Sequence, residues 1–137
     1  MAQRIRMITW AEGAGRALEG GLEELLHERR GLYWIDIEYP TEADLDRLAV
    51  DYGGPKVRWA DAARRAMVPK AQTYPDFVFI VWFVLEKFVP GKNVDPAQVF
   101  LFMTKDHLVT VHRNPVGLLD QVWEAFTSDL QMMAKSG

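Results

Sequence analysis

The segment Phe77–Leu85 reads FVFIVWFVL, and all nine of its residues are apolar. A membrane-spanning helix needs about 20 apolar residues, so a run of this length predicts a strand inside a globular domain. A strand with apolar side chains on both faces is typical of a sheet that is covered on both sides. The sequence therefore predicts that 77–85 runs through the middle of a sheet with helices above and below.

Two further apolar segments follow this strand at short intervals. Val99–Met103 (VFLFM) and Leu108–Val111 (LVTV) each have the length of a strand, and Thr104–Asp106 between them is suited to a tight turn. Pro90 and Gly91 mark an earlier turn region. Together the three segments predict an antiparallel meander.

The N-terminal half alternates strand and helix patterns. Arg4–Trp10 predicts a first strand, and the glycines from Gly13 to Gly21 predict a flexible turn region. Leucines spaced at the helical period then predict a helix that ends at Gly31; they are Leu18, Leu22, Leu25 and Leu26. Leu32–Tyr39 (LYWIDIEY) alternates apolar and polar side chains, which predicts a strand with one buried face.

Helices are predicted on both sides of the central strand. Thr41 and Asp44 form a capping-box pattern, and the helix behind them would bury Leu45, Leu48 and Ala49. A short helix is expected over 57–67. A closing helix over 116–133 has its apolar side chains on one side, namely Val116, Leu119, Val122, Trp123, Phe126 and Leu130.

These elements predict a fold of the α/β (α+β mixed) class, with a mixed, partly antiparallel sheet sandwiched between helices on both faces. The 137 residues, 49% hydrophobic and 26% charged, predict one soluble domain over 1–137. A net charge of −3 gives no basic field for nucleic acid. Because the chain has no cysteine, disulfide scaffolds, thiolate metal sites and cysteine nucleophiles are excluded.

The motifs for common chemistries are incomplete. Gly13-Ala14-Gly15 begins a dinucleotide-binding pattern, but Leu18 stands where its third glycine should be. His107 and His112 lie five residues apart in one strand, so they point to opposite faces and cannot chelate one metal ion together. Both are expected to be ordinary surface or capping histidines, as is His27 in its helix.

Two clusters keep alternative functions open. Asp36 and Glu38 share one strand face about 7 Å apart, where they could bind a cation or serve a metal-assisted hydrolase, although such pairs more often face solvent. The stretch 56–70 carries five basic residues against Asp61 alone, which predicts a surface for an acidic partner if the domain is a stand-alone binding module. The basic residues are Lys56, Arg58, Arg64, Arg65 and Lys70.

Three segments, taken in order, resemble the N-terminal cytoplasmic domain of the CorA-like divalent-cation transporter family. The first is Tyr33-Trp34-Ile35-Asp36-Ile37 with Pro40-Thr41 before a helix. The second is Asp61, then Pro69-Lys70 and Tyr74, then Asp76-Phe77-Val78-Phe79-Ile80-Val81. The third is Lys105-Asp106-His107-Leu108-Val109-Thr110-Val111-His112, and the resemblance spans about residues 32–126.

The resemblance implies a non-catalytic regulatory domain in the cytosolic funnel of a homopentameric magnesium or cobalt transporter at the cytoplasmic side of the inner membrane. Its partners would be the stalk and transmembrane helices of the same protein. The isolated domain, with no tightly bound cofactor, would be a monomer or weak dimer. Mg²⁺ or another divalent cation would bind at subunit interfaces, and the resemblance makes Glu86 and Asp95 the candidate metal ligands.

Overall fold

The computed structural model describes residues 3–53, 59, 70–85, 90–91 and 96–136, without the side chains of residues 70 and 130–136. Seven strands form one sheet in the order β2-β1-β3-β7-β6-β5-β4. The strands are β1 (Arg4–Ala11), β2 (Ala14–Glu19), β3 (Leu32–Glu38), β4 (Lys70–Thr73), β5 (Val78–Val84), β6 (Ala97–Met103) and β7 (His107–His112). The helices are α1 (Leu22–His27), α2 (Glu42–Asp51) and α3 (Gly117–Ser136).

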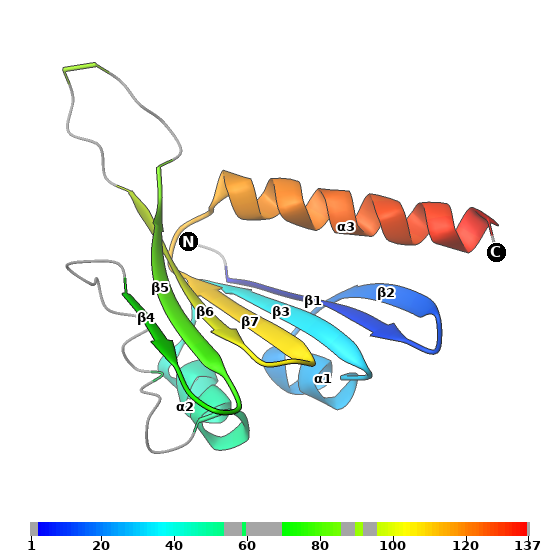
Figure 1. Ribbon diagram of the computed structural model, residues 1–137, viewed down its shortest axis with the longest axis horizontal. Helices are drawn as coiled ribbons and strands as arrows, with labels where there is room; N and C mark the ends of the chain where they lie inside the picture. Colours follow the sequence, from blue (N-terminus) through cyan, green and yellow to red (C-terminus); the bar gives the residue numbers. More distant parts are fainter. Residues whose placement is uncertain (1–2, 54–58, 60–69, 86–89, 92–95, 137) are drawn as a thin grey trace.

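The sheet is mixed because its two halves meet in a parallel pair. β3 and β7 run parallel, whereas the ladders on either side of them are antiparallel. β5, β6 and β7 form the predicted antiparallel meander. Helices α1 and α2 lie on one side of the sheet and α3 on the other (Figure 1). The predicted fold class is therefore confirmed.

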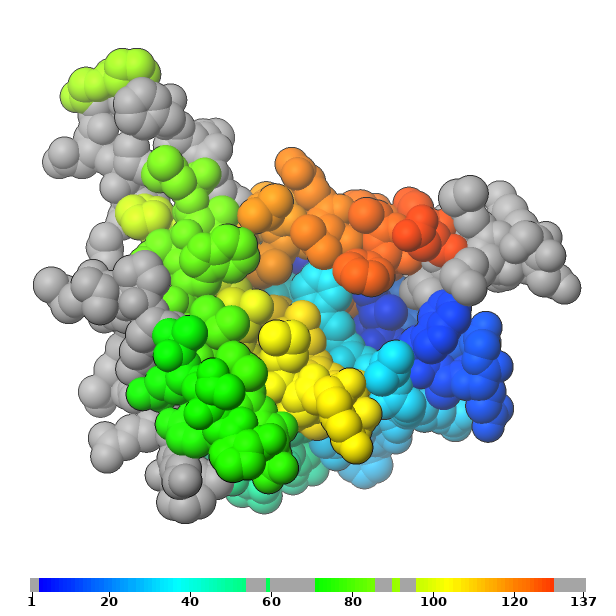
Figure 2. All heavy atoms as spheres, in the orientation of Figure 1, coloured from blue at the N-terminus to red at the C-terminus, as the bar shows by residue number. Residues whose placement is uncertain are grey.

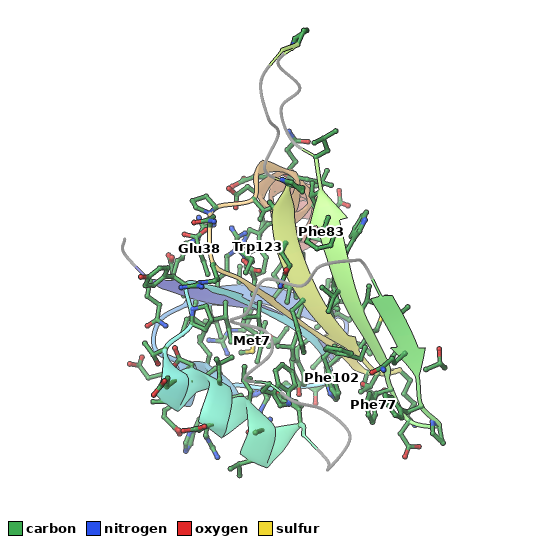
Figure 3. The ribbon with its side chains drawn as sticks, turned by 90° about the vertical axis from the view of Figure 1, so that its left-hand side faces the viewer. Met7, Glu38, Phe77, Phe83, Phe102 and Trp123 are labelled. Carbon is green, nitrogen blue, oxygen red and sulfur yellow. The ribbon has the colours of Figure 1, made fainter. Side chains whose placement is uncertain are left out.

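The main hydrophobic core lies between the sheet and the pair α1 and α2. In Figure 3, Met7 and Phe102 lie on this side of the strands, whereas Glu38 and Trp123 lie on the side of α3. Alternate residues of five strands face this core, so the packing follows the period of two in each strand. The buried members are Ile5, Met7, Leu22, Leu25, Leu26, Ile35, Ile37, Leu45, Leu48, Trp59, Phe79, Val81, Phe100, Phe102, Val109 and Val111.

The glycine-rich segment after β1 forms a strand rather than a flexible turn region. Glu12 and Gly13 both have positive φ values, 55° and 75°, and they reverse the chain in a tight hairpin. Leu18 then pairs with Met7 in the β1–β2 ladder, so it cannot begin the predicted helix. That helix spans only Leu22–His27 and ends before Gly31. Backbone pairing with β1 has overridden the helical spacing of the leucines.

The prediction that 77–85 runs through the middle of the sheet is wrong in position. β5 lies next to the edge strand β4 and is covered unevenly (Figure 2). Phe79 and Val81 are buried, but Trp82 is 50% exposed and Leu85 60% exposed. The apolar run predicts a strand correctly, but Trp82, which is opposite Val99 on the side of the sheet that carries α3, remains half exposed.

The helix predictions have mixed outcomes. The Thr41 capping box is present, with Asp44 N–H donating to the Thr41 hydroxyl and Thr41 N–H to the Asp44 carboxylate. Leu45 and Leu48 of α2 are buried, but Ala49 is exposed, which corrects that part of the prediction. The closing helix is confirmed as α3, although Val122 and Phe126 on its predicted apolar side are 38% and 51% exposed. The short helix expected over 57–67 lies outside the described residues, except for Trp59.

Candidate functional site

Charged residues of three strands lie side by side on the face of the sheet beneath α3. In one row, Arg6 of β1 is opposite Asp36 of β3, which is opposite Thr110 of β7. In the next row, Arg4 is opposite Glu38, and Glu38 is opposite His112. The register of the sheet thus brings together side chains from three segments that are far apart in the sequence.

Asp36 is at the centre of this group and is completely buried. Its Oδ2 accepts a hydrogen bond from Arg6 Nε at 3.0 Å, and its Oδ1 accepts one from the Thr110 hydroxyl at 2.6 Å. Burial alone would raise the pKa of Asp36, but the hydrogen bond and charge of His112, the Thr110 hydrogen bond and the charge of Arg6 together lower it. Asp36 is therefore an ionised carboxylate, and β3 is buried on both faces at this point rather than on one.

His112, also fully buried, bridges Asp36 and the loop that leads into α3. Its Nε2 lies 2.8 Å from Asp36 Oδ1, and its Nδ1 lies 2.7 Å from the carbonyl oxygen of Asn114. Both neighbours accept hydrogen bonds and cannot donate them, so the geometry calls for a proton on each ring nitrogen. Burial alone would lower the pKa of His112, but its hydrogen bond to Asp36 and the charge of that carboxylate outweigh burial and raise the pKa above 6.5. The expectation of an ordinary surface or capping histidine is thus wrong.

The first turns of α3 complete the group. Oδ1 of Asp120 accepts hydrogen bonds from Nη2 of Arg4 and Nη2 of Arg6, each at 2.8 Å. The Arg6 guanidinium also lies 4.4 Å from the ring centroid of Trp123, a cation–π contact. We refer to six residues, three cationic and three anionic when His112 is protonated, as the α3 ion network; they are Arg4, Arg6, Asp36, Glu38, His112 and Asp120.

Aromatic and aliphatic side chains flank the α3 ion network. Trp34 donates its indole N–H to the Thr110 hydroxyl at 2.9 Å, and its ring meets Trp123 edge-on at 4.9 Å. Ile8 belongs to the same small cluster. A second cluster of Val84, Val99 and Val116 lies on the other flank. Apolar packing therefore bounds the charges beneath α3, and it keeps water away from the buried Asp36 and His112 and strengthens their interaction.

The carboxylates of this arrangement are already paired with protein donors. Three donors occupy the oxygens of Asp36, and Glu38 pairs with Arg4 at 3.4 Å. Among the residues that the structure describes, no group of three or more histidine and acidic side chains could hold a metal ion. The geometry therefore does not support the hydrolase alternative built on Asp36 and Glu38.

The remaining sequence candidates lie elsewhere or outside the described residues. His107 projects from the opposite face of β7, stacked on Tyr33 at 4.9 Å, so it does not join His112. Burial lowers the pKa of His107, the opposite direction from His112. Glu86 and Asp95 are outside the described residues, as are the side chains of all five basic residues of 56–70.

Sequence reasoning missed the partners of Asp36. The signal that could have found them is the matching spacing of Arg4 and Arg6 in the first strand with Asp36 and Glu38 in the later one. Two strands with opposite charges at the same period of two can pair in a sheet. Asp120 carries no such signal, because it reaches the network only through the packing of α3.

A model of the family described as "CorA-like Mg2+ transporter protein" matches residues 29–135, which is more than three quarters of the chain. The chain belongs to this family. The matched region includes Asp36, His112 and Asp120 of the α3 ion network, whereas Arg4 and Arg6 precede it. A search of curated proteins found no match.

Solved structures of CorA-like proteins share the fold. The cytoplasmic domain of ZntB from Vibrio parahaemolyticus superposes with a TM-score of 0.67 at 12% identity, covering 93% of this chain and 51% of that one. The soluble domain of CorA from Methanocaldococcus jannaschii gives 0.61 at 16%, covering 93% and 46%. The complete CorA magnesium transporter from the same organism gives 0.63 at 14%, covering 90% and 37%. At this level of identity the structures establish the fold alone.

The chain spans about half or less of the length of these three CorA-like structures. In the part of the chain that the structure describes, no helix has the length and apolar character needed to cross a membrane. The similarity to the solved structures covers the sheet and its helices. The properties of the longer proteins are considered for this chain only as proposals.

Proposed function

We propose that this chain is the cytoplasmic domain of a CorA-like divalent-cation transporter, in which it serves a regulatory and non-catalytic role. The observation that carries the proposal is the family match over 29–135, which covers β3, the meander and α3. The printed descriptions of the matched structures support it, since one is a soluble domain of CorA and another a cytoplasmic domain of ZntB. The saturated hydrogen bonding of Asp36 supports a structural rather than catalytic use of the buried carboxylates.

In this proposal the domain works within a longer protein. That protein would contain a stalk helix and transmembrane helices, assemble as a homopentamer and place this domain at the cytoplasmic side of the inner membrane.

The proposed regulatory ligand is Mg²⁺ or another divalent cation at the interfaces between subunits, with Glu86 and Asp95 as ligands from this domain. Both residues fall in the sequence between β5 and β6. Hard cations bind carboxylate oxygens that converge from several elements. A bound cation would offset the repulsion between acidic surfaces and favour a closed assembly, whereas its removal would shift the population towards an open one.

Transport by the complete gene product tests the proposal. Vesicles that hold the reconstituted protein and a magnesium-sensitive dye should take up Mg²⁺. The gene should also encode two apolar stretches of about 20 residues. Absence of both would overturn the proposal.

Calorimetry on the assembled protein tests the two ligands separately. Glu86→Ala and Asp95→Ala should each weaken Mg²⁺ binding about tenfold or more. Glu42→Ala, which removes an exposed carboxylate at the start of α2, is the matched control and should leave binding unchanged. Unchanged binding in both variants would show that neither residue is a ligand, whatever the outcome of the transport assay.

A further inference from the structure

The α3 ion network holds α3 at two points, and both depend on His112 or on the carboxylate that it contacts. The first point is the Asn114 carbonyl, which accepts a hydrogen bond from Nδ1 of His112 just before the helix begins. The second is Asp120 in the first turn of the helix, which Arg6 links to Asp36. Besides the apolar contacts of Trp123 and Val116, a chain of charged hydrogen bonds thus links α3 to the sheet.

We propose that the packing of α3 on the sheet is linked to protonation, with the imidazolium of His112 as the group whose proton holds the helix in place. This inference goes beyond the proposed function, because it concerns the docking of α3 within this chain and holds whether or not the longer protein transports a cation.

The geometry supports this assignment because a neutral imidazole has only one N–H. The two groups that face the ring nitrogens of His112, the Asp36 carboxylate and the Asn114 carbonyl, are both acceptors. After loss of the proton one of them would face a lone pair at less than 3 Å, and the Asp36 carboxylate lies in a site that water does not reach. An acceptor buried without a donor costs the full desolvation of that group.

The charge balance leads to the same conclusion. With His112 protonated, the α3 ion network has equal numbers of positive and negative charges, and without that proton it has an excess negative charge. The charged or titratable groups around His112 are Asp36 and Glu38 of β3, Arg4 and Arg6 of β1, Asp120 of α3, and Arg113 next to it in the chain. Glu19 and Glu124 lie at the outer edge of the network, where they line a cavity of about 330 Å³ together with Arg4 and Arg6.

The direction of the pH effect follows from the raised pKa of His112. The stabilisation that its proton provides is fully present below about pH 6.5, the ordinary value for histidine. It is lost as the pH rises through the higher pKa of the folded state. Release of α3 is therefore expected on the alkaline side, and Asp36 remains ionised throughout.

Nuclear magnetic resonance of the imidazole nitrogens in the 137-residue chain is the first test. Both nitrogens of His112 should carry a proton at about pH 6, and the ring should titrate above 6.5, whereas His107 should titrate below it. A His112 that is neutral at about pH 6, or one that titrates at or below 6.5, would overturn the proposal even if no variant folds.

Hydrogen exchange of the α3 amides is the second test. The measured exchange rate, divided by the intrinsic rate at the same pH, gives the equilibrium constant for opening. This constant should rise about tenfold per pH unit between pH 6.5 and the pKa of His112 in the folded state. His112→Gln should abolish this rise. His107→Gln, on the same strand but the opposite face, is the matched control and should retain it. A rise that persists in His112→Gln would contradict a role for its proton.

Discussion

The two faces of the sheet are held to their helices by different kinds of interaction. Towards α1 and α2, alternate strand residues such as Met7, Ile35 and Phe100 form one continuous apolar core. Towards α3, the same strands present Arg6, Asp36 and His112, with apolar clusters only at the flanks. The difference shows that the same strands hold one helical layer mainly by apolar burial and the other by charge pairing with apolar contacts at its flanks.

Phe100→Ala should have the largest effect, because it tests the apolar face. Phe100 is completely buried and packs on Phe79 at 4.2 Å and Trp59 at 5.3 Å between ring centroids. Removing its ring should lower the free energy of unfolding by about 4 kcal/mol, as measured by urea denaturation. The loss should be the same at pH 6 and at pH 9, since no titratable group is removed. A strongly pH-dependent loss would contradict the division between the two faces.

Asp36→Asn tests the ionic face. The substitution keeps the shape of the side chain but leaves Arg6 and His112 without the negative charge that they share. The free energy of unfolding should fall by about 3 kcal/mol at pH 7. Because the pKa of Asp36 is lowered in the folded state, this contribution is present above about pH 3.8 and lost as the pH falls through the lowered pKa. The variant and the original protein should therefore converge in stability in acid.

Asp44→Asn is the matched control for that substitution, since Asp44 is a partly exposed carboxylate in the first turn of α2. Its effect on the free energy of unfolding should stay below about 1 kcal/mol. If the two aspartate variants lose equal stability at pH 7, the α3 ion network is not the source of the stabilisation.

Thr110→Val removes a single hydroxyl from the ionic face without changing the volume of the side chain. That hydroxyl accepts from the Trp34 indole and donates to Asp36. The variant should lose about 1.5 kcal/mol and show altered fluorescence of Trp34. Thr127→Val, whose hydroxyl donates only to carbonyls of its own helix, should change stability by less than about 0.5 kcal/mol and is the matched control.

Apart from the control variants, Trp82→Ala should have the smallest effect, and it defines where the α3 layer ends. Trp82 shares the face of α3 but is 50% exposed on β5. The loss should be below about 1 kcal/mol, because little packing is removed. A loss as large as that of Phe100→Ala would mean that the face of β5 beside α3 is packed as tightly as the main core.

The sequence predicts which segments form strands and helices better than it predicts which of these elements lie next to each other. The strands at the start of the chain, at 32–39 and in the meander are confirmed, because their apolar period is a local property. The hairpin strand β2 was missed, since AGRALE has little preference for a strand and depends on pairing with β1. The position of β5 near an edge was also missed, because a run of apolar residues does not say which strands will flank it.

The candidate site could be predicted only in part for the same reason. The alternation in LYWIDIEY places Asp36 and Glu38 on one face correctly. It cannot show that β1 and β7 supply Arg6, Thr110 and His112 to that face, because those partners depend on strand order and register. Hence, of two carboxylates that the sequence more often assigns to a solvated surface, Asp36 is completely buried, Glu38 is partly buried, and both are paired with arginines.

The central claim is that charge pairing between Asp36 and His112 fastens α3 to the sheet, and a double-mutant cycle measures it directly. Unfolding of the original protein, Asp36→Asn, His112→Gln and the double variant should be followed by urea at about pH 6 and about pH 10. We predict a coupling free energy of about 2 kcal/mol at the lower pH, falling towards zero at the higher one as His112 loses its proton. A coupling that is absent at the lower pH, or equal at both, would contradict the account.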